Sequence, residues 1–305
     1  MKYIKIKFWG ARGSIATPGP STLRYGGNTP CVEIQFQNGP LFIMDAGTGI
    51  RELGKNLLKR PNPVSAYIFI SHFHWDHIQG LPFFRPAYEP GNKFTILGSD
   101  DASLNLDQII AFQMDPTYFP VAIEDLRADI HFRSIKEEAI EIEGVTVQTI
   151  YLNHPGYALG FRMQYMDRTV VYISDNEPFQ YTNYTHDFNN FKSKSPRLED
   201  LFDNFIEDRN DSLIRFCKNA DILIHDTQFL PEEYESKVTW GHSPFNYTVD
   251  LAAKSNVKNL ILFHHDPNHD DEMIDQIQER SREILAGENL PIECNAAREG
   301  MTIEI

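Results

Sequence analysis

The sequence lacks long apolar runs and lacks an excess of basic residues. No apolar run approaches the roughly 20 residues that span a bilayer, so we expect no membrane association. The 305 residues include 28 Lys and Arg against 43 Asp and Glu, which gives a net charge of -15. Binding of long nucleic acid needs a broad basic face, and this charge balance argues against one.

Cysteine is also scarce, and the three cysteines are far apart in the chain: Cys31, Cys217 and Cys294. An odd number at such spacing predicts free thiols rather than a disulfide framework. The first residues, MKYIKIKFWG, show no apolar segment followed by a small-residue cleavage site. We therefore expect a cytoplasmic protein in a reducing compartment.

What is present indicates a globular protein, because 41% of the residues are apolar and 23% are charged. Strand and helix signals alternate along both halves of the chain. This pattern predicts two sheets packed face to face with helices outside them. No linker separates two units, so we expect a single domain over residues 1–305.

The element boundaries follow from alternation of apolar residues and from turn residues. Strands are predicted at 3–8, 31–36, 41–44, 66–70, 94–97, 129–132, 145–151, 158–165, 169–173, 222–224 and 260–263, with two short strands after 285. Helices are predicted at 50–58, 103–112, 212–218, 244–254 and 270–285. The stretch 177–211 is polar and aromatic and lacks clear strand alternation. We interpret it as an insertion or lid, or alternatively as a solvated loop.

The most informative segment is Ser71-His72-Phe73-His74-Trp75-Asp76-His77, directly after a predicted strand. Imidazole and carboxylate groups are the ligands of zinc and similar metals. Alternation along an extended segment places His72, His74 and Asp76 on one side, and His77 then follows a turn. A lone histidine is usually an ordinary side chain, but three histidines and an aspartate at this spacing predict a metal site.

Three more ligand types follow the ends of predicted strands: His154, Asp175 and His264. Each could be a surface or capping residue if it stood alone. Strand ends gathered at one sheet edge are where functional sites are built, because the scaffold fixes them and the loops leave them open. A buried carboxylate there needs a cation to offset its desolvation.

Together these residues resemble the metallo-β-lactamase superfamily, over essentially the whole chain. The match is to its HxHxDH signature and its later ligands, at His72, His74, Asp76, His77, His154, Asp175 and His264. The resemblance implies an αββα four-layer sandwich with two divalent metal ions at one edge. It implies zinc, with manganese or iron as alternatives.

The resemblance also implies how the ligands divide. One ion is expected on His72, His74 and His154. The second is expected on Asp76, His77 and His264. Asp175 is expected to bridge the two, together with a water or hydroxide that attacks the substrate, so Asp76 and Asp175 are needed for the nucleophile.

Within the superfamily the chain is most similar to the phosphodiesterase branch, which includes ribonuclease Z and cyclic-nucleotide phosphodiesterases. The similar segments are NHPGYALGFR, ISDNE, IHDTQF, WGHSPF and LILFHHDP. The resemblance implies that Asp226 orients His242 and that His242 donates a proton to the leaving oxygen. The neighbours His225 and His265 are not expected to be ligands, because adjacent strand positions point to opposite faces.

The chain departs from ribonuclease Z because it has no long basic arm rich in glycine and proline. With the net charge of -15, this favours a small phosphodiester substrate, most plausibly a cyclic nucleotide, over a long nucleic acid. The alternatives are hydrolysis of a thioester, lactone or lactam, RNA processing, and a metal-binding sensor without activity. The 177–211 stretch could cover the site or form a homodimer contact.

Two loops are further candidates. Asp45, in the turn 45–49, resembles an aspartate that supports the metal site in this superfamily. The glycine-rich loop 10–30 carries Arg12, Arg24, Tyr25 and Asn28. Its glycines would let the backbone approach a ligand closely, but a purely structural network of turns explains the loop equally well.

Overall fold

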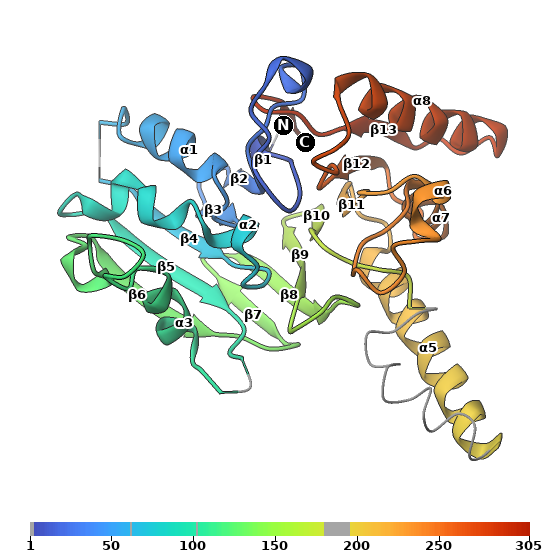
Figure 1. Ribbon diagram of the computed structural model, residues 1–305, viewed down its shortest axis with the longest axis horizontal. Coiled ribbons are helices and arrows are strands. Elements are labelled where there is room, and N and C mark those ends of the chain that lie inside the picture. The colour runs from blue at the N-terminus through green and yellow to red at the C-terminus, as the bar shows by residue number, and fades with distance from the viewer. Residues whose placement is uncertain (1–2, 62, 102, 180–195) are drawn as a thin grey trace.

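The computed structural model describes residues 3–61, 63–101, 103–179 and 196–305, and these form two sheets with helices on their outer faces (Figure 1). The order in the first sheet is β14-β1-β2-β3-β4-β5-β6, and in the second β13-β12-β11-β10-β9-β8-β7. Each sheet is antiparallel at one side and parallel at the other, with β3 to β6 and β10 to β13 parallel. The two sheets therefore repeat one pattern.

The first sheet comprises β14 (Thr302–Glu304), β1 (Ile4–Gly10), β2 (Cys31–Phe36), β3 (Leu41–Met44), β4 (Ser65–Phe69), β5 (Lys93–Gly98) and β6 (Asp129–Ser134). The second comprises β13 (Glu293–Ala296), β12 (Asn259–Phe263), β11 (Ile222–Asp226), β10 (Arg168–Ile173), β9 (Leu159–Tyr165), β8 (Val145–Tyr151) and β7 (Ala139–Ile142). The helices are α1 (Gly49–Leu57), α2 (Trp75–Ile78), α3 (Leu106–Gln113), α5 (Pro196–Cys217), α6 (Pro231–Tyr234), α7 (Phe245–Lys254) and α8 (Asp271–Gly287).

Aromatic side chains from both sheets fill the space between them. Phe69 of β4 meets Phe161 of β9 with 5.4 Å between ring centroids, and Phe8 of β1 meets Phe263 of β12 at 6.1 Å. Because neighbouring strand residues point to opposite faces, Ile68 beside Phe69 lies instead in the apolar cluster under α1 and α3. In the second sheet the same alternation places apolar side chains in a cluster under α7 and α8. The expected αββα four-layer sandwich is confirmed.

The two ends of the chain lie side by side (Figure 1). Strand β14 pairs antiparallel with β1, and Lys5 is opposite Glu304 in the register. Among the described residues, none of the helices has the length and apolar character needed to cross a bilayer.

Two expectations about elements need correction. Strand β7 was not predicted, because its four residues alternate over too short a run. Helix α5 begins at Pro196, well before the expected start at Ser212, so the later part of 177–211 is helical and projects from the body (Figure 1). The absence of strand alternation favoured a loop there, although Leu198, Leu201 and Phe202 begin an apolar pattern at helical spacing. Residues 180–195, where the expected insertion or lid is centred, lie outside the described residues.

Candidate metal centre

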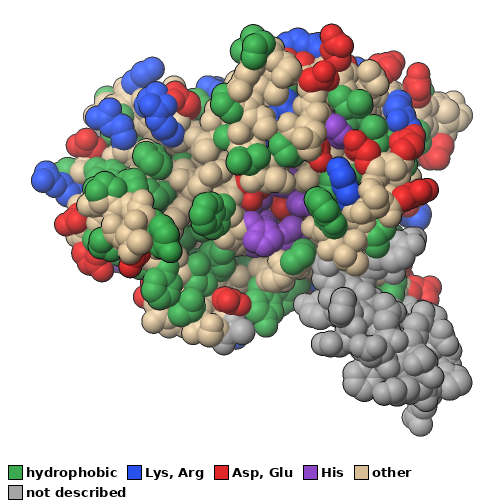
Figure 2. Space-filling model, in the orientation of Figure 1, with side chains coloured by type: hydrophobic (Ala, Val, Ile, Leu, Met, Phe, Trp, Pro, Cys, Tyr) green, Lys and Arg blue, Asp and Glu red, His purple; other side chains and the backbone are tan. Residues whose placement is uncertain are grey.

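The predicted ligands come together at the carboxyl ends of the strands. His72 follows β4, His154 follows β8, Asp175 follows β10 and His264 follows β12. Figure 2 shows histidine side chains gathered near the middle of one face, between the two halves of the molecule. Sheet edges of this kind hold sites because the strands fix the backbone from which each side chain starts.

The ligand atoms form two groups that share the division implied by the superfamily. Within each group the ligand atoms lie within 4.8 Å of one another. One group is His72, His74 and His154, and the other is Asp76, His77 and His264. The histidine rings within each group are in contact. The centroids of His74 and His154 are 4.8 Å apart, and His77 stacks on His264 with centroids 5.3 Å apart.

Asp175 lies between the two groups and offers one oxygen to each. Its Oδ2 lies 3.7 Å from His72 Nε2 and 3.8 Å from His154 Nε2. Its Oδ1 lies 3.2 Å from His77 Nε2 and 3.4 Å from His264 Nε2. This geometry suits a carboxylate that bridges two cations.

Buried polar atoms without a hydrogen-bond partner indicate that the cluster fits a metal. In the described part of the chain, His72 Nε2, His77 Nε2 and Asp175 Oδ1 are buried and have no hydrogen-bond partner. Buried polar atoms are nearly always paired, because an unpaired one forfeits its hydration. A set of imidazole nitrogens and carboxylate oxygens is the donor set of zinc. The buried clusters are therefore consistent with a dinuclear metal site.

The protonation states also suit ligands. Burial lowers the pKa of His72 well below its usual value and that of His154 to about 3, so both rings are neutral at pH 7. Burial alone would raise the pKa of Asp175, but His264 and His77 lower it well below its usual range. Neutral imidazole and ionised carboxylate are the forms that bind metal.

A second layer of hydrogen bonds orients the rings. Asp45 Oδ2 lies 2.9 Å from His77 Nδ1 and accepts from Tyr172 Oη at 2.7 Å. His154 Nδ1 donates to Gly241 O at 2.8 Å, and His264 Nδ1 to Gln228 Oε1 at 2.8 Å. Each bond holds one ring nitrogen and turns the other toward the centre, as in known metal sites.

The N-terminal loop reaches the centre through residues that the sequence did not single out. Ser14 N donates to Asp76 Oδ2 at 2.8 Å. Gly13 packs so closely that a Cβ there would lie 2.4 Å from His264 Nδ1. Arg12, by contrast, is buried and donates to the carbonyls of Asp266 and His269, so it joins the loop to the C-terminal half. The glycines at 10 and 13 were the only available signal.

Asp226 and His242 meet beside the two ligand groups. His242 Nδ1 lies 2.9 Å from Asp226 Oδ2, which also accepts from Asn176 N at 3.1 Å. The His242 ring stacks on His264 with centroids 5.0 Å apart. Burial alone would lower the pKa of His242, but Asp226 raises it to about 9. The pair therefore holds a proton at neutral pH.

One detail differs from the expected geometry. Asp76 does not continue the alternation of His72 and His74, because helix α2 begins at Trp75 and turns Asp76 toward His77. As expected, His225 and His265 stand outside the ligand groups: His225 Nδ1 donates to Asp226 O, and His265 Nε2 donates to Ala297 O.

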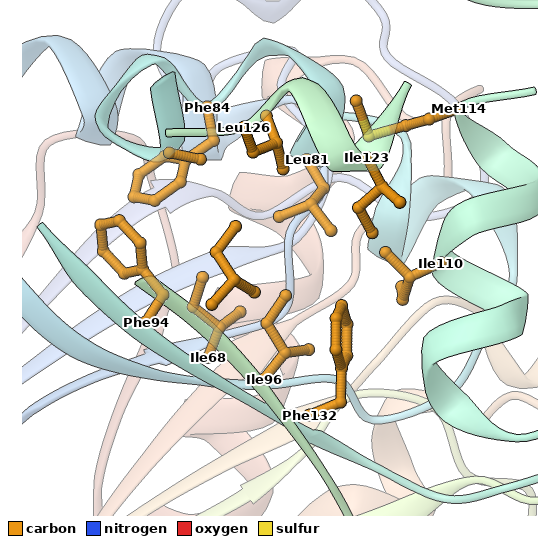
Figure 3. Close-up of a pocket in the computed structure, with 12 residues that line it drawn as sticks. Ile68, Leu81, Phe84, Phe94, Ile96, Ile110, Met114, Ile123, Leu126 and Phe132 are labelled. Carbon is orange, nitrogen blue, oxygen red and sulfur yellow. The ribbon is translucent and has the colours of Figure 1, made fainter. Parts of the chain in front are cut away.

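A separate apolar cavity does not belong to this centre. Figure 3 shows Ile68, Phe94 and Ile110 among the side chains that enclose it, under the helices on the outer face of the first sheet. Its volume of about 10 Å³ is hardly enough for one water molecule. It is a packing defect of the core rather than a substrate pocket.

Comparison with known proteins places this geometry in a family. The family model described as the beta-lactamase superfamily domain matches residues 41–192. The chain belongs to the metallo-β-lactamase superfamily. It is distantly related to the ribonuclease Z of Thermoplasma acidophilum, with 25% identity over 296 residues that cover 87% of each chain.

Solved structures of the superfamily share the fold. The metallo-β-lactamase fold protein YhfI from Bacillus subtilis is 17% identical, with a TM-score of 0.67 and 99% of each chain covered. A diphosphatase from the PhnP family is 16% identical, with a TM-score of 0.66, and the match covers 99% of this chain and 98% of the other. At these identities the likeness establishes the fold alone.

Proposed function

We propose that this protein is a metal-dependent phosphodiesterase that acts on a small nucleotide, most plausibly a cyclic one. The observation that carries the proposal is the Asp226–His242 pair beside two groups of metal ligands. The relatives support it, since ribonuclease Z and the PhnP-family diphosphatase are named for reactions at phosphorus.

The division of labour follows from the contacts. His72, His74 and His154 would hold one ion, Asp76, His77 and His264 the other, and Asp175 would contact both. When bound, two such ions supply Lewis-acid charge to a phosphate and lower the pKa of a water. Asp45 and Gln228 hold the histidine rings that face the ions.

The chain's own acid would be His242. Asp226 accepts from His242 Nδ1, so the proton at Nε2 is the one free to reach a leaving oxygen. General acid catalysis of this kind contributes typically about 10²–10⁴-fold. It matters most for an alkoxide such as a ribose oxygen, which leaves poorly unless it is protonated.

Two exposed aromatics favour a substrate that carries a base. Trp75, which is 80% exposed, stands between His74 and Asp76 in the chain. Trp240, which is 60% exposed, comes two residues before His242. Nucleobases stack on aromatic side chains. With a net charge of -15, attraction of a phosphate would come from the centre itself rather than from a broad basic surface.

The test is a turnover screen of the purified, metal-loaded protein with zinc or manganese. It includes cyclic mononucleotides, bis(p-nitrophenyl) phosphate, a precursor transfer RNA, a thioester and a lactone, with Asp175→Asn as the inactive control. We expect turnover of the cyclic nucleotides and of bis(p-nitrophenyl) phosphate. The proposal is refuted if protein that holds two ions turns over neither the cyclic nucleotides nor bis(p-nitrophenyl) phosphate. If the protein cleaves transfer RNA in preference, the substrate is RNA and not a small nucleotide.

A further inference from the structure

Glu177 is a buried carboxylate that none of the roles above uses. It lies two residues after Asp175, has no exposed surface, and accepts three hydrogen bonds. The donors are Tyr234 Oη at 2.8 Å, Thr239 N at 2.7 Å and Gly241 N at 3.0 Å. All three donors are uncharged. Burial of a carboxylate is costly, so its place here calls for an explanation.

The loop that it contacts has an unusual backbone. Thr239 has φ of 76° and Gly241 has φ of 89°, both in the left-handed region. That region is unfavourable for a β-branched residue such as Thr239. The amides of residues 239 and 241 converge on one carboxylate, as in the concave amide nests that bind anions. Glu177 therefore holds a strained conformation in place.

The held loop orients two residues of the candidate centre. Gly241 O accepts from His154 Nδ1 at 2.8 Å, and His242 follows Gly241 directly. At its other end, Glu177 N donates to Asn153 O at 2.9 Å, next to His154. Glu177 thus ties together the β8–β9 loop, the end of β10 and the loop 239–242.

We propose that Glu177 is a positioning residue that clamps residues 239–242, so that His154 is held as a metal ligand and His242 as a proton donor. The part that concerns His242 rests on the proposed function. The part that concerns His154 does not, because it can be read from metal binding alone.

The central experiment is Glu177→Gln. Glutamine keeps one oxygen as an acceptor but replaces the other by an NH₂ group, which cannot accept. At least one of the present donors to Glu177 therefore loses its acceptor. With excess zinc we expect kcat for a cyclic nucleotide to fall about tenfold or more with KM changed less than about threefold, because positioning of the acid is lost. For bis(p-nitrophenyl) phosphate, whose leaving group needs little acid, the fall should be smaller.

The second readout is zinc affinity in a chelator competition. Loss of an outer hydrogen bond to a ligating histidine typically weakens metal binding about 10–100-fold. We expect one of the two ions to be weakened in Glu177→Gln and the other to be little changed.

The matched control is Asp221→Asn. Asp221 is likewise a buried carboxylate that accepts from a backbone amide, Thr169 N at 2.8 Å. It directly precedes the first residue of β11, however, whereas Asp226 of the candidate centre is the last residue of that strand. Its loss should lower stability without changing zinc affinity or the ratio of the two activities. A backbone control is the double variant Glu177→Gln, Thr239→Gly. Glycine adopts positive φ without strain, so it should recover part of both losses.

The proposal is overturned if Glu177→Gln keeps both zinc affinities and the wild-type ratio of activities, or if its losses match those of Asp221→Asn. If Glu177→Gln does not fold, Tyr234→Phe removes a single donor and should give a smaller loss of the same pattern. An unchanged pattern there would overturn the clamp. If the wild type turns over no phosphodiester, the proposed function fails while the zinc competition still decides the role of Glu177.

Discussion

Asp175 Oδ1 lies 3.2 Å from His77 Nε2, and its second oxygen faces the other ligand group. One side chain therefore joins both halves of the candidate centre. The orphaned His77 Nε2 and Asp175 Oδ1 have no hydrogen-bond partner in the described part of the chain, which leaves a cation as the natural compensation.

The first prediction concerns that shared carboxylate. Asp175→Asn removes a charge from both groups, so we expect bound metal to fall from two ions per chain to one or none. Elemental analysis after dialysis measures this, with Asp221→Asn as a control that keeps two ions. Retention of two tightly bound ions in Asp175→Asn would contradict the bridging geometry.

The second prediction concerns stability. Metal that binds only the folded chain stabilises it, by about 2.7 kcal/mol per site at a free concentration 100 times Kd. Chelation should therefore lower Tm, and added zinc should restore it, as followed by calorimetry. A Tm that neither chelation nor added zinc changes would contradict a dinuclear site in the folded chain.

The third prediction uses two glycines of one loop. In Gly13→Ala the new Cβ would lie 2.4 Å from His264 Nδ1, and the packed ring has no room to move, so zinc affinity and activity should both fall about tenfold or more. Gly19→Ala is the control, because a Cβ there meets nothing within 4 Å. Equal behaviour of the two variants would show that the loop does not constrain His264.

The fourth prediction separates proton donation from metal binding. His242→Ala should keep both ions but lower kcat for a cyclic nucleotide about 10²–10⁴-fold, while hydrolysis of bis(p-nitrophenyl) phosphate falls much less. Steady-state kinetics with both substrates gives the ratio. A uniform loss would mean that His242 acts on the centre as a whole and is not the acid.

The fifth prediction is a pH dependence of stability. Burial alone would raise the pKa of Asp221, but hydrogen bonds from Lys258, Thr169 N and Arg168 leave it lowered. Its contribution is therefore present above the unfolded pKa of about 3.9 and is lost as pH falls through the lower folded value. In metal-free protein, Asp221→Asn should be less stable than wild type at pH 7, and the gap should be smaller at pH 2. Urea unfolding at both pH values measures the gap, and a gap that did not narrow would show that Asp221 acts by packing.

The sequence predicted the layered fold and the ligand set because both depend on local patterns. Alternation identified most strands, and the spacing from His72 to His77 has a chemical reason that is visible without coordinates. Helix α5 was missed in its first part because the polar and aromatic stretch before it lacks strand alternation, which favoured a loop over all of 177–211. Apolar residues do recur at helical spacing from Leu198 onward.

The outer contacts made by backbone amides were beyond prediction for a physical reason. Ser14 N reaches Asp76 across 62 positions, and Glu177 reaches Gly241 across 64. Such bonds depend on how loops converge after the sheets pack, and a backbone amide leaves no trace in the residue type. The glycine at position 13 hinted at close approach but not at its partner.

The pairing of β1 with β14 has a consequence for biosynthesis. Strand β1 finds its outer neighbour only in residues 302–304, and Gly13 and Ser14 can close over the centre only once His264 has been made. Folding of the first sheet during translation therefore stays incomplete until residues 302–304 have left the ribosome. The candidate centre is therefore completed late in synthesis, once the loop after β1 meets the residues that follow β12.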